Sequence, residues 1–210
     1  MLVNKTINEY MLALASGLPA PGGGSVAALT GALGAGLLAM VCHLTMGKEE
    51  FADREKEVKK VLEESDDLRA RLSFLVDEDA TAFSDVVVAL KLPKDTPQEK
   101  EVRNKAIQNG YKKAADVPYR IATTSFELLV LAKKLVTLSN PTVISDVGVA
   151  ALNAYASVES AIMNVNINLT SIKDGLYKND KKEKMAKLLK ESAELSSEIY
   201  QDVNKMLQLV

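Results

Sequence analysis

Between Glu9 and Lys48 the chain carries no aspartate, glutamate, lysine or arginine. The core of this stretch, from Val26 to Met46, is long enough to cross a bilayer as a helix. It also contains glycines, threonines and one histidine, and no second hydrophobic stretch free of polar residues follows it. Small residues at these positions favour close packing inside a protein. We therefore expect a helix buried in a core, and no membrane span.

The charge balance and the metal-binding residue types exclude several classes of protein. The chain has 26 Lys and Arg against 28 Asp and Glu, a formal net charge of −2, so no overall positive field attracts nucleic acid. The single Cys42 cannot form an internal disulfide, which fits a reducing compartment, and we expect a cytoplasmic protein. With one histidine and one cysteine the chain lacks the ligands of a structural zinc site, and we expect no metal.

Apolar residues recur at helical spacing along almost the whole chain. They predict helices over 6–14, 25–46, 51–90, 97–138, 141–173 and 181–209. Turn residues separate these segments, and long helices joined by short connections become antiparallel neighbours. We therefore predict an all-α fold, an up-and-down bundle of long antiparallel helices that forms one domain over residues 1–210. Pro118 predicts a kink or a break near Asp116.

Asp79 is the acidic residue that falls on the apolar face of segment 51–90. It lies four residues after Leu75 and four before Phe83, whereas the neighbouring acids Asp77, Glu78 and Asp85 are rotated toward the polar side. A carboxylate at such a position loses hydration, which raises its pKa and suits general acid–base chemistry. A structural salt bridge, or a cap on a neighbouring helix, is the alternative.

Segment 141–173 has charged side chains only at Asp146, Glu159 and its last residue. One of its stripes is apolar, and the adjacent stripe is polar and mostly neutral. Asn164 and Asn168 on the polar stripe present amides to one surface at a spacing of four residues. They predict either a polar ligand or hydrogen bonds to a neighbouring helix.

A glycine-rich turn precedes the uncharged helix and comprises Pro21, Gly22, Gly23, Gly24 and Ser25. Free backbone amides at a helix start hold carboxylates or phosphates, and glycines let a ligand approach the backbone closely. No strand precedes this turn, as a dinucleotide site would require. The alternative is a flexible turn in which Ser25 caps the helix.

Cys42 and His43 are adjacent in sequence and so about 100° apart around a helix. We therefore do not expect them to face one site together, and we interpret both as core or interface residues.

Several motifs in order resemble one known family. They are PAPGGGSVAA at 19–28 with GALG at 31–34, LTMGK at 44–48, DATAF at 79–83 with LPK at 92–94, AADVP at 114–118, SDVGVAA at 145–151 and NVNINL at 164–169. In these segments the chain resembles the cyclodeaminase domain of formiminotransferase-cyclodeaminase, together with stand-alone cyclodeaminases and methenyltetrahydrofolate cyclohydrolases. The resemblance covers nearly the whole chain.

This resemblance implies an all-helical domain that dimerises and releases ammonia from 5-formiminotetrahydrofolate to give 5,10-methenyltetrahydrofolate. Such a lyase belongs to one-carbon metabolism and histidine degradation, and it needs no cofactor beyond its tetrahydrofolate substrate. The formiminotransferase step would take place on a separate chain. A methenyltetrahydrofolate cyclohydrolase and a non-catalytic helical oligomer are the alternatives.

The resemblance also suggests a role for each candidate residue. Asp79 would carry the proton. Asp146 would orient the pterin or face the cationic amidine, and Asn164 and Asn168 would contact the edges of the pterin. The turn from Pro21 to Ser25 would hold the ligand by its backbone, while Lys48 and Lys94 would face the glutamate carboxylates. The uncharged helices offer more apolar surface than one small bundle hides, so we expect at least a homodimer with the folate site near the subunit interface.

Overall fold

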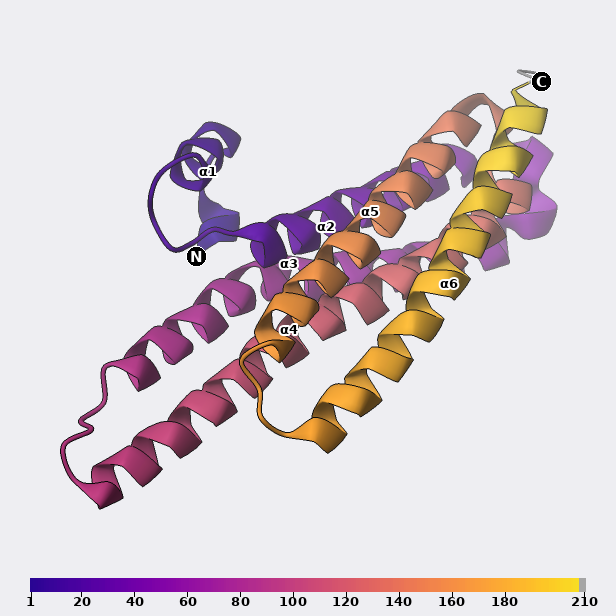
Figure 1. Cartoon of the computed structure of the whole chain (residues 1–210). Coiled ribbons are helices and arrows are strands. Elements are labelled where there is room, and N and C mark those ends of the chain that lie inside the picture. The colour runs from indigo at the N-terminus through magenta and orange to yellow at the C-terminus, as the bar shows by residue number, and fades with distance from the viewer. Residues whose placement is uncertain (208–210) are drawn as a thin grey trace.

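The computed structural model describes residues 1–207, and these fold into one domain of α-helices (Figure 1). The bounds of the long elements confirm the predicted all-α fold. In chain order, the α-helices of this part of the chain are α1 (Ile7–Leu14), α2 (Gly23–Thr45), α3 (Glu55–Leu90), α4 (Pro97–Leu138), α5 (Ile144–Leu169) and α6 (Gly175–Met206). Short 3-10 helices stand at η1 (Leu2–Asn4), η2 (Glu49–Arg54) and η3 (Pro141–Val143). Residues 208–209, the end of the last predicted helix, lie outside the described residues.

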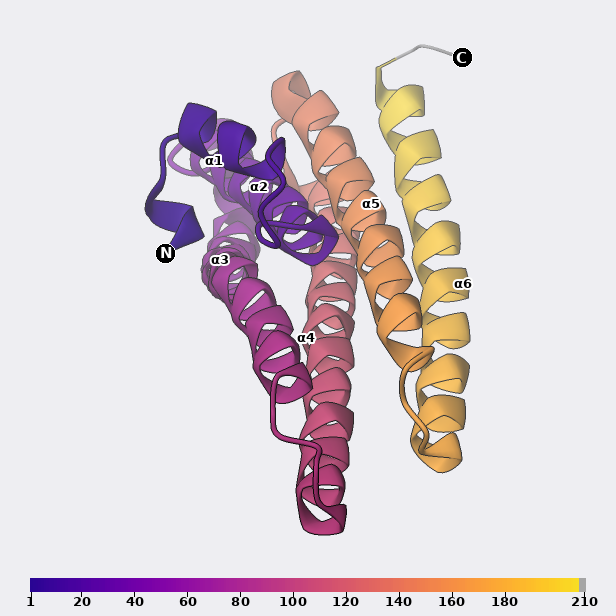
Figure 2. The same ribbon diagram turned by 60° about the vertical axis from the view of Figure 1, so that its left-hand side comes forward.

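The long helices run alternately up and down, as predicted. Helices α2, α3, α4 and α5 form a four-sided core, in which each packs against its neighbour in sequence and α2 packs against α5. Helix α6 lies outside this core against α5 and α4, and it runs beside α5 in both views (Figures 1 and 2). The ends of α3 and α4 around their connection extend beyond α2 as a hairpin (Figure 1).

Two helix starts follow the expected capping chemistry, and a third does not. Thr6 and Glu9 form a complete capping box on α1. Helix α2, however, begins at Gly23, with Gly22 at the cap position and no side-chain cap. The interpretation of Ser25 as the cap is therefore wrong, because Ser25 lies inside the first turn and its hydroxyl bonds to α3. Thr96 caps α4 in the same way as Thr6 caps α1.

Helix α2 packs in the centre of the bundle. Its most apolar 18-residue window has a mean hydropathy of 1.9, long and apolar enough for a membrane span, yet 61% of that window is buried inside the fold. A Cβ on Gly31 would stand 2.8 Å from Ser125 Oγ of α4, and a Cβ on Gly34 would stand 3.0 Å from the carbonyl oxygen of Ala150 on α5. The small residues of α2 thus let neighbouring helices approach closely, which is how an uncharged helix is buried in a four-helix core.

Two further predictions about local structure need correction. Helix α4 continues unbroken through Pro118, because that residue and its neighbours Val117 and Ile121 are buried against adjacent helices. Cys42 is fully buried, and burial raises the pKa of its thiol to about 12. His43, in contrast, is exposed and so is not a core residue, and its interpretation as an interface residue stays a prediction.

Candidate active site

Asp79 of α3 lies directly against the first turn of α2. A Cβ placed on Gly24 would stand only 2.1 Å from Asp79 Oδ1, so only glycine leaves room for the carboxylate there. The hydroxyl of Ser25 donates to Asp79 Oδ2 at 3.2 Å and to the carbonyl oxygen of Val76 at 2.9 Å. The backbone N–H of Ser25 also hydrogen-bonds to the carboxylate. The glycine turn and the predicted carboxylate therefore belong to one site.

Burial raises the pKa of the Asp79 carboxyl above its usual range, and the hydrogen bonds from Ser25 offset part of that rise. No salt bridge reaches this carboxylate within residues 1–207. The structure thus excludes the salt-bridge alternative in this part of the chain and keeps the capping alternative beside the catalytic one. A carboxyl with a raised pKa and no cationic partner is a candidate for general acid–base catalysis.

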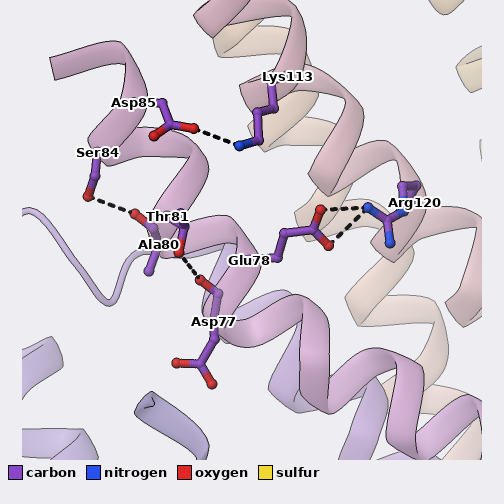
Figure 3. Close-up of polar contacts among 8 residues, drawn as sticks. All are labelled: Asp77, Glu78, Ala80, Thr81, Ser84, Asp85, Lys113 and Arg120. Carbon is purple, nitrogen blue, oxygen red and sulfur yellow. Dashed lines mark hydrogen bonds and ion pairs between the residues drawn. The ribbon is translucent and has the colours of Figure 1, made fainter. Parts of the chain in front are cut away.

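The acidic neighbours of Asp79 on α3 have partners of their own, and Figure 3 shows Glu78 and Asp85 each paired with a basic residue of α4. Glu78 accepts two hydrogen bonds from Arg120 of α4, at 2.8 and 2.9 Å. Asp85 accepts from Lys113 of α4 at 2.6 Å. Asp77 instead accepts from the backbone N–H groups of Leu2 and Val3, which ties the N-terminal segment to α3. These ion pairs hold α3 against α4 and leave Asp79 as the acid that faces the glycine turn.

A cavity of about 400 Å³ opens at this junction of the helices. Its walls come from the turn before α2, from α3, α4 and α5, and from the loop between α5 and α6. The lining residues are Pro19, Ala20, Gly22, Gly23, Gly24, Asp79, Ala80, Phe83, Tyr111, Ala114, Asn164, Ile167, Asn168, Thr170 and Ser171. Pro21 and Ser25 are buried directly behind the lining. The volume lies within the range typical of small-molecule sites.

The two predicted asparagines line this cavity and use their amide hydrogens on backbone carbonyls. Asn164 Nδ2 donates to the carbonyl oxygen of Ser160 at 2.8 Å. Asn168 Nδ2 donates to the carbonyl oxygens of Ala114 and Asn164, both at 2.8 Å. Neither Oδ1 atom accepts a hydrogen bond from residues 1–207. The bond of Asn168 to α4 confirms the predicted hydrogen bond to a neighbouring helix for that residue, and binding of a polar ligand by the two Oδ1 atoms stays a prediction.

Three other predicted site residues are not brought to this cavity within one chain. Asp146 precedes Asn164 by 18 positions on α5, about 27 Å along the helix axis at 1.5 Å per residue. Lys48 follows the far end of α2, about 30 Å from the glycine turn by the same measure. Lys94 is exposed in the loop after α3. None of the three lines the cavity, so their contact with a ligand stays a prediction.

Sequence reasoning missed several residues of the cavity wall. Phe83 had been counted as part of the apolar stripe of its helix, yet it is 46% exposed and faces the cavity. Tyr111 stands one helical turn before Ala114 on α4, and this spacing to the AADVP motif was the available signal. Thr170 and Ser171 belong to the α5–α6 loop, whose position depends on the packing of α6.

Tyr10 is the buried residue of α1 and lies close to the same site. Burial, followed by the negative charges of Asp79 and Asp77, raises the pKa of its phenol. Its hydroxyl has no hydrogen-bond partner among residues 1–207. The same residues contain no group of three His, Cys, Asp or Glu side chains that would hold a metal ion.

The fold and the cavity define a class: a helical-bundle protein whose candidate small-molecule site is built around one desolvated carboxyl. Comparison with known proteins then identifies the family. Residues 6–187 match the formiminotransferase-cyclodeaminase family model, and the chain belongs to this family. The resemblance seen in the sequence motifs is thereby confirmed.

Relatives of this chain carry the names of folate-processing enzymes. The chain is 40% identical over 203 residues to the methenyltetrahydrofolate cyclohydrolase of Methylorubrum extorquens. The aligned region covers 97% of this chain and 98% of that protein. It is 35% identical over 191 residues to the formimidoyltransferase-cyclodeaminase of Rattus norvegicus, covering 91% of this chain and 35% of that protein. The chain thus spans about a third of the length of its animal relatives.

The fold also matches a solved structure. The crystal structure of formiminotetrahydrofolate cyclodeaminase from Thermotoga maritima superposes with a TM-score of 0.82 at 29% sequence identity. The match covers 99% of this chain and 98% of the other.

Proposed function

We propose that this protein is a formiminotetrahydrofolate cyclodeaminase, a lyase that converts 5-formiminotetrahydrofolate to 5,10-methenyltetrahydrofolate and ammonia. One observation carries the proposal: Asp79, with a raised pKa and no cationic partner in the described chain, lies in a cavity beside a glycine turn. In this reaction N10 of the folate attacks the amidine carbon of the formimino group. The bond from that carbon to the departing nitrogen then breaks, and ammonia leaves.

Asp79 supplies the proton transfers that this reaction requires. Its carboxylate takes the proton from N10 as the new carbon–nitrogen bond forms, and its acid form gives a proton to the departing amine. A carboxyl whose pKa lies above the usual range performs both steps better than an ordinary surface aspartate. Ser25 positions the carboxylate through its two hydrogen bonds.

The rest of the cavity complements a pterin. The Oδ1 atoms of Asn164 and Asn168 are acceptors without protein partners, and they suit the amine and amide N–H groups of a pterin edge. The backbone of Gly22, Gly23 and Gly24 approaches the ligand without side chains in between. Phe83 and Tyr111 provide aromatic surface for a planar ring.

A methenyltetrahydrofolate cyclohydrolase is the second candidate, and the 40% identity to the Methylorubrum extorquens protein over nearly all of both chains favours it. In that reaction Asp79 would activate a water molecule that attacks the methenyl carbon. The same proton carrier serves both reactions, so a direct assay separates them.

The deciding experiment gives the purified protein each substrate in turn. Ammonia release from 5-formiminotetrahydrofolate supports the cyclodeaminase, and hydrolysis of 5,10-methenyltetrahydrofolate without ammonia release supports the cyclohydrolase. Absence of both activities, together with no thermal stabilisation by 5-formyltetrahydrofolate, would leave the non-catalytic oligomer.

We also propose that the protein works as a homodimer in the cytoplasm, with no cofactor beyond its folate and with any formiminotransferase on a separate chain. Exposed apolar side chains form a row on one face of each of two helices: Leu33, Met40 and Leu44 on α2, and Val149, Leu152, Met163 and Ile167 on α5, where the exposed Glu159 stands between Leu152 and Met163. Ile167 also lines the cavity, so this row reaches the site. Sedimentation at low micromolar concentration tests the dimer, and a monomer with full activity would contradict it.

A further inference from the structure

The proline inside α4 removes a hydrogen-bond donor at a particular place. Proline has no backbone N–H, so Pro118 cannot donate to the carbonyl oxygen of Ala114, four residues earlier in the same helix. The pyrrolidine ring also crowds that carbonyl and turns it away from the helix axis. Ala114 lines the cavity. A backbone acceptor is therefore available at the wall of the candidate site.

Asn168 of α5 uses this acceptor. Its Nδ2 donates to Ala114 O at 2.8 Å, and its second hydrogen goes to the carbonyl oxygen of Asn164 at 2.8 Å. Both partners are carbonyls, so a flipped amide would set Oδ1 against two acceptors and lose both bonds. The orientation of the side chain is thus fixed by its surroundings, and Oδ1 remains without a partner within residues 1–207.

We propose that Pro118 is a positioning residue for the candidate site: it frees the Ala114 carbonyl for Asn168 and thereby fixes Asn168 Oδ1 as a hydrogen-bond acceptor for an N–H group of the ligand. Two separate motifs, AADVP on α4 and NVNINL on α5, are joined by this contact. The identity of the ligand as a reduced folate rests on the proposed function, whereas the link between Pro118 and Asn168 does not.

The contact also defines what the ligand must offer. An asparagine free to rotate presents either a donor or an acceptor, but an Asn168 held by two carbonyls presents an acceptor only. A ligand with an N–H at this point gains a hydrogen bond, while one with a carbonyl or ring nitrogen there meets an unfavourable acceptor pair. Asn168 therefore selects the donor-bearing edge of a pterin.

The test is a double-mutant cycle with Pro118→Ala and Asn168→Ala, using 5-formyltetrahydrofolate as the titrated ligand. Pro118→Ala restores the N–H that competes for Ala114 O, and we expect folate affinity to fall by up to about tenfold, the worth of about one hydrogen bond. The melting temperature should stay the same or rise, because α4 regains a helix bond. In the Asn168→Ala background the same proline change should alter affinity no further.

Pro97→Ala is the matched control and should leave affinity unchanged. Pro97 lies at position N1 of α4, where a backbone N–H has no carbonyl partner within the helix.

A second measurement does not depend on folate. The side-chain amide of Asn168, assigned by its loss in Asn168→Ala, should exchange its hydrogens with solvent slowly in the wild-type protein and faster in Pro118→Ala. Unchanged exchange, or affinity losses that add in the double mutant, would overturn the proposal.

If wild-type protein does not bind 5-formyltetrahydrofolate, the proposed function fails, and the exchange measurement still decides whether Pro118 acts on Asn168. Should Pro118→Ala not fold, Pro118→Ser serves instead, because serine also restores the backbone N–H that competes for Ala114 O.

Discussion

At the end of the bundle where α2 stops and α4 turns into α5, the polar groups of Thr45 and Asn140 bond to each other and to nearby backbone. Asn140 is only 4% exposed. Its backbone N–H donates to the Thr45 hydroxyl oxygen at 3.0 Å, and its Nδ2 donates to Leu44 O at 3.3 Å. Its Oδ1 accepts from the backbone and the hydroxyl of Thr142. We call this region the closed end.

The opposite end, which holds the cavity, is built from the same residue types with a different outcome. Asn164 and Asn168 also donate to backbone carbonyls, yet their Oδ1 atoms are left without partners in the described chain. Asp79 is desolvated and receives hydrogen bonds from Ser25 alone. We call this region the pocket end.

The comparison shows what separates a structural asparagine from a ligand-binding one. Residue type is the same at the two ends and does not decide function, although Asn140 is buried in the loop before η3 and Asn164 and Asn168 are half-buried within α5. The deciding quantity is the number of donors and acceptors that the fold leaves unused, because natural folds satisfy buried polar groups unless a site requires otherwise. Changes at the pocket end should therefore lower activity, and changes at the closed end should lower stability.

The largest effect is expected for Asp79→Asn. The amide cannot carry the proton, so the rate should fall by about 10²–10⁴ while the protein stays folded. Steady-state rates and the circular dichroism spectrum measure the two parts of this expectation. A rate near that of the wild type would assign Asp79 to packing and capping, and the contrast between the ends would fail.

Asn140→Ala at the closed end should do the reverse. It removes the side-chain partner of the Leu44 carbonyl and of the backbone N–H and hydroxyl of Thr142, and we expect the free energy of unfolding to fall by ~1–3 kcal/mol. Urea denaturation measures this change, and kcat at a temperature where the variant is folded should match the wild type. A loss of kcat in folded protein would show that the closed end takes part in the reaction.

The sequence predicts on which helix face the residues of the pocket end lie, but it does not predict which of them contact each other. Helical periodicity places Asp79 on an apolar face and Asn164 with Asn168 on one polar stripe, which is local information. The contact between Asp79 and Gly24 depends on the register of α3 against α2, and periodicity does not set register. Periodicity also places Asp146 and Asn164 on one stripe of α5, but it does not bring them to one site. Residues on one stripe are separated along the helix axis by 1.5 Å for every position between them.

Gly23→Val should weaken folate binding by about tenfold, the worth of about one hydrogen bond, with a smaller effect on stability. A Cβ at this position would stand 3.0 Å from Asn164 Nδ2, so the added side chain pushes on the asparagine and fills the cavity beside it. Paired titrations with 5-formyltetrahydrofolate and urea give both quantities. Gly36→Val, elsewhere on α2 with only Arg69 Cδ at 3.8 Å, is the matched control for the cost of valine in this helix. A collapse of the denaturation midpoint with unchanged affinity would make the turn structural.

The smallest effect concerns how Asp79 changes the pH dependence of stability. Burial raises its pKa, so the folded protein binds this proton more tightly than the unfolded chain does. Stability is therefore highest below the unfolded pKa of about 3.9 and falls as the pH rises through the folded pKa, after which the loss is complete. Asp79→Asn removes this titration, so the unfolding free energy of the variant relative to wild type should increase between acidic and neutral pH.

Asp174→Asn should show the opposite trend, because the hydrogen bond from Lys112 lowers the pKa of Asp174 and the contribution of Asp174 to stability is lost as the pH falls. Urea midpoints at several pH values measure both variants. If Asp79→Asn instead became less stable than wild type toward neutral pH, the charged carboxylate would be a stabilising cap on α2, and the pocket end would then resemble the closed end.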